Sequence, residues 1–336
     1  MTTAQLNRAR LLLCDLHDQI RATLIQARQK DSARFADIAA VTAADTIYHV
    51  DKISEEAILA WFTAHWPKAW AVELVMEGIE DEPVTFPAGT PVAKTRWKCI
   101  IDPIDGTRNL MYDKRSAWIL TGLAPQRGQA TRLGDIAVAV MTELPTSKMW
   151  RSDQVSGLRG RGAAGIHATG CDVRTGEKTA LALHPSSARD FKHGFASLTR
   201  FFPEGKALTA KIEEALWDEL YGLGSTASPL VFDDQYITTG GQVYELLCGH
   251  DRMIGDLRPL VLKKLGYTSS LVCHPYDICT ELILTEAGGV IEDPLGRPLN
   301  APLDTVSPVS WIGYANPVLA KTVRPILKRL IKSHLA

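Results

Sequence analysis

The sequence lacks the features of a secreted, membrane-spanning or nucleic-acid-binding protein. Its 336 residues include only six cysteines and no Cys-x-x-Cys pair, so we expect no disulfide framework and favour a reducing cytoplasm. Lysine and arginine (37) balance aspartate and glutamate (38), which argues against binding nucleic acid or an anionic membrane through bulk charge. The apolar run Leu11–Cys14 is too short for a signal-peptide core or a membrane span.

The composition is that of an ordinary globular protein. Hydrophobic residues make up 46% and charged residues 22% of the chain, and the length fits two domains or one large α/β unit. The mixed order of strand and helix patterns predicts a layered α/β sandwich. We expect an N-terminal half, residues 1–185, and a C-terminal half, residues 186–336, that together form one continuous structural unit.

Hydrophobic spacing predicts the main elements. Apolar residues three and four apart between Leu6 and Leu24 indicate an amphipathic helix, and a second helix is expected to begin with Ser54 as its N-cap and to end before Pro67. Short β-rich runs predict strands at 71–76, 97–101, 117–124 and 135–144. Further helices are predicted at 208–221, 242–250 and 276–289, the last one closed by two glycines.

Two carboxylates three positions apart follow the strand predicted at 97–101. Pro103 lacks the N–H that a strand ladder needs, so we expect the chain to turn there and to present Asp102 and Asp105. Carboxylate oxygens clustered at a turn suit Mg²⁺, and the N–H groups of Gly106 and Thr107 at a helix start suit a phosphate. Asp-Pro and Asp-Gly also occur in ordinary turns, so the local pattern leaves a plain turn or cap open.

The hexapeptide DPIDGT at 102–107 resembles a signature of the inositol monophosphatase superfamily, which are Mg²⁺-dependent, lithium-sensitive phosphatases that include fructose bisphosphatases. Glu77 follows the strand at 71–76, where the family has a metal-binding glutamate. Tyr276-Asp277 opens a segment ending in EAGG and resembles the second signature, in which the family usually has Trp-Asp. The resemblance implies a five-layered αβαβα sandwich of the inositol monophosphatase and fructose bisphosphatase type.

The resemblance also implies roles for individual residues. Two or three Mg²⁺ ions would be bound by Glu77, Asp102, the Ile104 carbonyl, Asp105 and Asp277, and the substrate phosphate by the amides of Gly106 and Thr107. The catalytic residues would be Glu77, Thr107 and Asp51, with Asp45 as the alternative partner of Thr107. The other carboxylates that compete with Glu77 are Glu73, Glu80, Asp81 and Glu82.

The sequence departs from the inositol phosphatase pattern beside the expected site. Arg108 begins a basic run in which Arg108, Tyr112 and Arg115 are expected to share a helical face, either binding a second anionic group or pairing with surface acids. Gly240 and Gly241 lie at a helix start before Gln242, whose amide could bind a sugar hydroxyl. The segment 258–274 is longer than in inositol phosphatases and could reshape the pocket for the leaving alcohol.

These patterns predict an Mg²⁺-dependent phosphomonoesterase that acts on a small phosphorylated polyol or sugar, as inositol-phosphate phosphatases do. The alternatives are a bisphosphate nucleotidase, a fructose-1,6-bisphosphatase, or a non-catalytic sensor that binds sugar phosphates on the same fold. We expect a small phosphorylated substrate as partner, with no nucleic acid and no membrane. Because the relatives are commonly homodimers, we also expect a homodimer.

Overall fold

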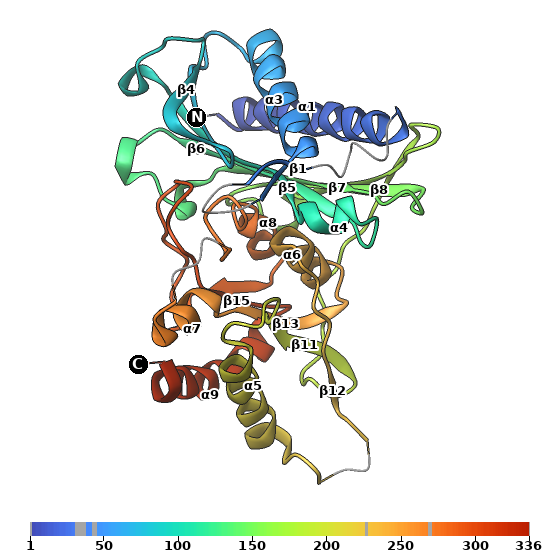
Figure 1. Cartoon of the computed structure of the whole chain (residues 1–336), viewed down its shortest axis with the longest axis vertical. Coiled ribbons are helices and arrows are strands. Elements are labelled where there is room, and N and C mark those ends of the chain that lie inside the picture. Colours follow the sequence, from blue (N-terminus) through green and yellow to red (C-terminus); the bar gives the residue numbers. More distant parts are fainter. Residues whose placement is uncertain (1, 31–37, 42–45, 226–227, 268–270, 336) are drawn as a thin grey trace.

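The chain forms five stacked layers in which helices and β-sheets alternate (Figure 1). The structure is a computed structural model that describes residues 2–30, 38–41, 46–225, 228–267 and 271–335. The layered α/β sandwich expected from the sequence is confirmed. Asp45, the alternative partner of Thr107, lies outside the described residues, and the side chains of Glu80, Asp81 and Glu82 are likewise not described.

The first layer consists of two helices, α1 (Thr3–Lys30) and α3 (His49–His65), which pack on each other and on the larger sheet. The predicted first helix is confirmed, because the apolar face of α1 from Leu13 to Leu24 is buried. The expected start of the second helix is wrong. Helix α3 begins at His49, so Ser54 is no N-cap, and its hydroxyl instead donates to the backbone carbonyl of Asp51 at 2.7 Å.

The second layer is an eight-stranded sheet in the order β10-β9-β8-β7-β6-β5-β3-β4. Its strands are β3 (Val72–Met76), β4 (Ile79–Phe86), β5 (Trp97–Asp105), β6 (Ala117–Pro125), β7 (Val138–Leu144), β8 (Arg151–Leu158), β9 (His167–Asp172) and β10 (Lys178–Ala180). Neighbouring strands are antiparallel except β3 and β5, which run parallel. Outside this sheet, β1 (Ile38–Val41) pairs antiparallel with β2 (Thr46–Tyr48).

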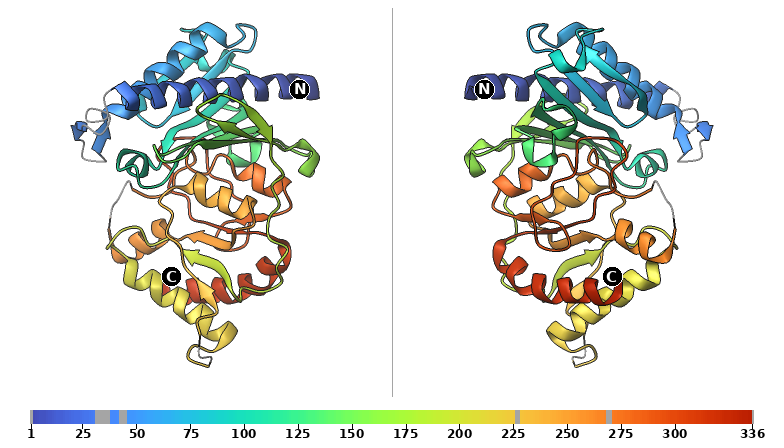
Figure 2. Two further views of the ribbon diagram at one scale, coloured as in Figure 1. Left: turned by 90° about the vertical axis from the view of Figure 1, so that its right-hand side faces the viewer. Right: turned by 90° about the vertical axis from the view of Figure 1, so that its left-hand side faces the viewer.

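Helices α6 (Thr239–Leu247) and α8 (Glu281–Glu286) form the middle layer, between the two sheets (Figure 2). The second sheet, ordered β12-β11-β13-β15-β14, comprises β11 (Gly194–Leu198), β12 (Val231–Phe232), β13 (Asp251–Asp256), β14 (Val290–Glu292) and β15 (Trp311–Tyr314). The outer layer contains α5 (Lys206–Tyr221), α7 (Arg258–Leu265) and α9 (Pro317–Leu335). The other helices among the described residues are α4 (Thr107–Met111) and the 3₁₀ turns Val92–Lys94, Gly128–Ala130, Leu133–Asp135 and Gly162–Gly165.

Three helix predictions have different outcomes. The helix predicted at 208–221 is confirmed as α5 and ends at Gly222. The helix predicted at 242–250 begins earlier, at Thr239, which places both glycines of the Gly-Gly pair inside its first turn. Only Glu281–Glu286 of the predicted segment 276–289 is α-helical, because a series of turns precedes α8 and holds Asp277.

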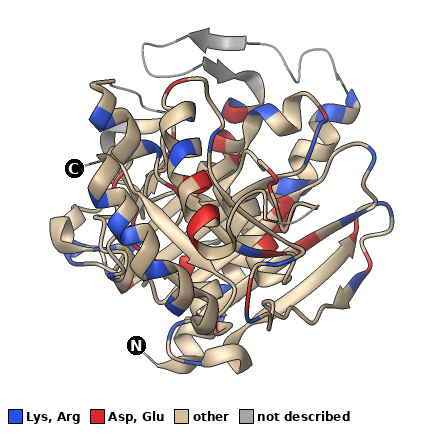
Figure 3. Ribbon diagram, turned by 90° about the horizontal axis from the view of Figure 1, so that it is seen from below, with Lys and Arg blue, Asp and Glu red and all other residues tan. Residues whose placement is uncertain are grey.

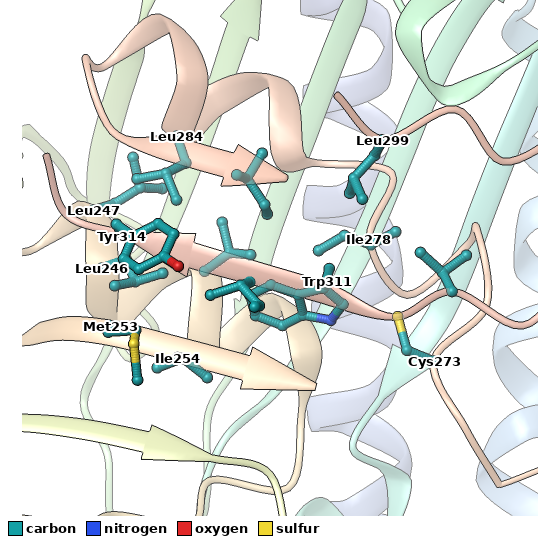
Figure 4. Packing of buried hydrophobic residues seen from close by; sticks show 14 of the residues in the cluster. Leu246, Leu247, Met253, Ile254, Cys273, Ile278, Leu284, Leu299, Trp311 and Tyr314 are labelled. Carbon is teal, nitrogen blue, oxygen red and sulfur yellow. The ribbon is translucent and has the colours of Figure 1, made fainter. Parts of the chain in front are cut away.

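Apolar side chains of the middle layer pack between the two sheets. Leu246 and Leu247 of α6 pack against the buried rings of Trp311 and Tyr314 on β15, and Leu284 of α8 joins them (Figure 4). Burying a side chain of this size contributes about 1.5–3 kcal/mol, so the two sheets are held at a fixed spacing around α6 and α8. This spacing fixes the position of the first turn of α6 relative to the larger sheet.

Basic and acidic residues are interspersed over the lower face of the molecule (Figure 3), as the near-neutral net charge would suggest. None of the helices in the described part of the chain is both long enough and apolar enough to cross a membrane.

A buried histidine links α1 to the larger sheet. The ring nitrogens of His17 lie 2.7 Å from Thr121 Oγ1 and 2.9 Å from Thr142 Oγ1, and the residue is fully buried. Burial, with a smaller effect from the charge of Arg21, lowers the pKa of His17 from 6.5 to about 3. The unfolded chain therefore takes up a proton near pH 6.5 that the folded protein does not accept until about pH 3.

We therefore predict that His17 reduces stability as the pH falls below 6.5. A proton that the unfolded chain binds and the folded protein does not lowers the free energy of unfolding by about 1.4 kcal/mol for each unit by which the pH falls. Urea unfolding of the wild type and of His17→Gln between pH 7.5 and 4.5 measures the effect as a difference of slopes, because all other groups are shared. Parallel slopes for the two proteins would contradict the prediction.

Candidate metal and phosphate site

The two carboxylates of the DPIDGT motif face the same side of the larger sheet because β5 contains a bulge. The expectation that Pro103 ends the strand is wrong, since β5 continues to Asp105. Asp102 pairs with Leu120 and Asp105 with Trp118, so three steps on β5 match two on β6. The extra residue accommodates the proline and turns Asp105 to the face that Asp102 occupies, where an unbroken strand would alternate them.

Asp105 is held by the first turn of α6. Its carboxylate accepts hydrogen bonds from the Thr238 hydroxyl, the Thr239 amide at 3.2 Å and the Gly240 amide at 2.5 Å. A Cβ atom at position 240 would lie 3.1 Å from the Asp105 carboxylate, so a glycine permits this approach. The N–H groups at the start of a helix favour a negative charge, which explains why the chain tolerates a buried carboxylate here.

Asp277 and Glu77 reach the site from two other elements. In the described part of the chain, the ligand atoms of Asp102, Asp105 and Asp277 lie within 4.8 Å of one another, and this group does not include Glu77. The Asp277 carboxylate accepts a hydrogen bond from the His274 amide at 2.6 Å. Parallel pairing of Met76 with Ile101 places Glu77 beside Asp102, and the Glu77 amide donates to the Ile101 carbonyl at 3.4 Å.

Burial and mutual repulsion oppose the simultaneous ionisation of the carboxyl groups in this cluster. Burial, followed by the charges of Glu77, Asp105 and Asp277, raises the pKa of Asp102 well above its usual value. Burial and the charge of Asp105 likewise raise the pKa of Asp277. Burial raises the pKa of Asp105 to about 6, although hydrogen bonds from α6 oppose the shift. Such a group of buried oxygen donors has the chemistry of a site for a hard divalent cation.

Thr107 lies at the first position of α4, directly after the carboxylates. Its hydroxyl lies 2.9 Å from the Ile104 carbonyl and 3.3 Å from Asp51 Oδ1 in the first turn of α3. A hydroxyl has one hydrogen, so these two oxygens compete for it. The structure thus brings Asp51 and Thr107 together across 56 positions of sequence, while Ile104 presents its carbonyl at the same point.

Gly106 precedes α4 with a φ of +94°, a left-handed conformation that glycine adopts without strain. A Cβ atom there would lie 3.0 Å from the Ile237 carbonyl and 3.1 Å from Thr238 Cβ. Gly106 and Thr107 therefore connect the end of β5 to α4. At this point Ile237 and Thr238, just before α6, lie close to the backbone of Gly106. Helix α4 has only five residues, so its N-terminus alone defines no anion site.

The expected basic helical face is absent from this part of the structure. Helix α4 ends at Met111, so Arg108 and Arg115 do not share a helix. Arg115 pairs with Asp234 at 2.9 Å and stacks on the Tyr236 ring at 3.8 Å. For Arg115, the structure supports the alternative of pairing with a surface carboxylate.

The three residues expected to contact the substrate at the start of α6 have contacts within the protein. Gln242 is buried inside the molecule, and its side-chain amide donates to Thr199 Oγ1 at 3.2 Å. Gly240 uses its amide to bind Asp105, and a Cβ at Gly241 would lie 2.3 Å from the Tyr236 ring. All three residues therefore position α6, and their contact with a substrate stays a prediction.

Sequence reasoning missed Thr238 and Arg258. Thr238 both caps α6, by accepting a hydrogen bond from the Gly241 amide, and binds Asp105. The string Thr-Thr-Gly-Gly before an apolar run was a recognisable cap signal for the first of these roles. Arg258 appeared in the sequence only as one of many scattered charges, yet in the structure it lies near the carboxylate cluster and lowers the pKa of Asp277.

No protein-family model and no curated protein sequence matches the chain. Solved structures do. The fructose-1,6-bisphosphatase of Leishmania major aligns over 96% of this chain and 93% of its own, with a TM-score of 0.66 and 14% identity. The extragenic suppressor protein SuhB of Bartonella henselae aligns over 97% and 98%, with a TM-score of 0.63 and 16% identity.

A third structure is a hypothetical protein from Pyrococcus horikoshii, PH1897, described as having similarities to inositol-1 monophosphatase. It aligns over 95% of this chain and 98% of its own, with a TM-score of 0.60 and 15% identity. The chain therefore has the αβαβα fold of the inositol monophosphatase and fructose bisphosphatase superfamily, over nearly its whole length. At this level of identity the likeness establishes the fold alone.

Proposed function

We propose that the protein is a Mg²⁺-dependent phosphomonoesterase of the inositol monophosphatase superfamily. The observation that carries the proposal is the convergence of Asp102, Asp105 and Asp277, of which the first two are buried, from two distant segments into one cluster. Two buried carboxylates and a half-buried third, with no divalent ion, would cost the fold stability, since the charged groups oppose one another's ionisation. A catalytic metal site explains this cost, and the αβαβα fold and the DPIDGT motif agree with it.

The ligand set that we propose is Glu77, Asp102, the Ile104 carbonyl, Asp105 and Asp277, for two or three ions. All are hard oxygen donors, which Mg²⁺ prefers. Bound ions would supply Lewis-acid polarisation of the phosphate ester and a lowered pKa for a water molecule. Asp105 keeps its orientation through α6, and Asp102 through the Ile104 amide at 3.0 Å, so the chain holds both carboxylates in place beforehand.

Thr107 and Asp51 are the residues that we propose to move the proton of the attacking water. With the Ile104 carbonyl engaged by a cation, the Thr107 hydroxyl would donate to Asp51 and leave its lone pairs directed at water. Asp51 lies in the first turn of α3, where the helix dipole favours its charged form. The amides of Gly106 and Thr107 would bind the phosphate oxygens, and Arg108 remains a candidate contact to the substrate.

The remaining expectations about the protein stay predictions. The division at residue 185, the homodimer and the cytoplasmic location have support from the sequence only. For the substrate, we propose a small phosphorylated polyol or sugar. A fructose bisphosphatase or bisphosphate nucleotidase would need a second anion site, and Arg115, one candidate for it, is paired with Asp234.

A panel of phosphate esters tests the proposal. We predict Mg²⁺-dependent release of phosphate from inositol 1-phosphate and from phenyl phosphate, with activity lost on chelation and restored by Mg²⁺. Selective release from fructose 1,6-bisphosphate would instead support the bisphosphatase. If no ester were hydrolysed but sugar phosphates raised the melting temperature, the protein would be a sensor.

A further inference from the structure

Two arginines follow the neighbouring parallel strands β11 and β13 at the same edge of the smaller sheet. Leu198 of β11 pairs with Gly255 of β13, and Arg200 and Arg258 come two and three residues later. In α/β proteins, ligands bind beyond the carboxyl ends of parallel strands. The position of these arginines therefore suits contact with a substrate.

Arg258 is held rigidly by its neighbours. Its Nη2 donates to Asp256 Oδ2 at 2.6 Å, its Nε to the same carboxylate at 3.0 Å, and its Nη1 to the Leu271 carbonyl at 3.1 Å. The guanidinium lies 4.8 Å from the Phe201 ring centroid and 5.5 Å from that of Phe202. A guanidinium has five N–H hydrogens, so these bonds leave two of them for another acceptor.

Arg258 also lies close to the carboxylate cluster. Its side chain is only 13% exposed, and the Leu271 carbonyl that it binds lies three residues before His274, whose amide donates to Asp277 at 2.6 Å. A phosphate ester bound at the cluster would therefore extend its alcohol towards the ends of β11 and β13. Within the described residues no further hydrogen bond uses the two remaining N–H groups of Arg258, so a hydroxyl group of the substrate can accept from them.

The charges at this edge are already compensated. Arg258 pairs with the buried Asp256, and Arg200 pairs with both Glu213, at 2.9 Å, and Asp233. These two cations and three carboxylates give a local charge of −1, so a second phosphate or a carboxylate would find no excess positive charge here. Hydroxyl oxygens accept N–H hydrogen bonds without adding charge, and the Phe201 ring offers an apolar surface to C–H groups.

We propose that Arg258 is a specificity-determining residue that binds hydroxyl groups of an uncharged leaving alcohol. Asp256 is a positioning residue, because it fixes the guanidinium and touches no substrate. The proposal rests on the phosphatase function proposed above and assigns the residue that selects the alcohol. It predicts a polyhydroxylated monophosphate rather than a bisphosphate as the preferred substrate.

The test compares Arg258→Gln with the wild type on inositol 1-phosphate and on phenyl phosphate, whose alcohol has no further hydroxyl. The ratio of kcat/KM for the two esters is expected to fall roughly 10-fold to 100-fold in the variant, mainly through KM. Arg324→Gln is the matched control, because Arg324 also pairs bidentately with a carboxylate, Glu292, with both bonds at 2.7 Å. Its ratio should equal that of the wild type.

Binding to metal-free protein provides a readout that does not depend on catalysis. Inositol, the leaving alcohol without its phosphate, is expected to raise the melting temperature of the wild type and of Arg324→Gln, but less that of Arg258→Gln. If Arg258→Gln does not fold, Arg258→Lys replaces it, since lysine keeps the charge but loses the fork of donors, and its ratio should also fall.

Two results would overturn the assignment of Arg258. The first is an unchanged ratio of kcat/KM; if both esters lost activity equally and the Mg²⁺ dependence changed, the effect of Arg258 would lie on the metal ligands. The second is a wild type that prefers fructose 1,6-bisphosphate. If the wild type hydrolyses no ester, the phosphatase proposal fails by itself, and the metal-free binding comparison still decides for or against Arg258.

Discussion

Replacing Asp102 or Asp277 by asparagine should lower kcat by about 10²- to 10³-fold, because each variant loses a proposed metal ligand whose ion would supply several kcal/mol of transition-state stabilisation. The fold should not suffer. An asparagine oxygen can still accept the Ile104 amide in one case and the His274 amide in the other. Removing one of the repelling carboxylates should even raise the melting temperature of the metal-free protein.

The matched control for Asp102→Asn is Asp172→Asn. Asp172 also accepts the amide of the residue two positions later, Arg174, at 2.9 Å, but it lies on β9, four strands away from β5 in the larger sheet. Phosphate release by Asp172→Asn should equal that of the wild type. Full activity in Asp102→Asn, or an equal loss in the control, would contradict the proposed ligand set.

From the short motif we predicted that Asp102 and Asp105 lie together, but we did not predict the local backbone structure that brings them together. Asp102 and Asp105 were predicted as neighbouring carboxylates from six residues, because a strand end followed by Gly-Thr is a local pattern. The bulge at Pro103 was not predicted, since it depends on the register with β6. Without that register, sequence spacing alone would place the two side chains on opposite faces of β5.

Long-range contacts explain the other errors. Ser54 looks like an N-cap because it precedes acidic residues, but α3 extends back to His49, a boundary that local pattern alone did not identify. Gln242 looks available for a sugar, yet α6 is packed between two sheets and buries it against Thr199. Arg258 gains its position from the pairing of β11 with β13 and from stacking on Phe201.

The cluster also predicts how metal binding and pH act together on stability. Burial raises the pKa of Asp105 to about 6, above the ordinary value of 3.8. A carboxyl group with a raised pKa stabilises the fold while it is protonated, and this contribution is lost as the pH rises from 3.8 through about 6. Metal-free protein should therefore carry a destabilising set of charges at pH 8 that is largely relieved at pH 5.

Mg²⁺ should compensate for this cost, because an ion that binds only the folded state adds about 2.7 kcal/mol at 100 times its Kd. We expect Mg²⁺ to raise the melting temperature of chelator-treated protein by several degrees at pH 8 and by clearly less at pH 5, where protons compete for the same oxygens. Asp102→Asn should lose most of the increase, and Asp172→Asn should keep it. An equal increase at both pH values, or in both variants, would mean that Mg²⁺ binds somewhere other than this cluster.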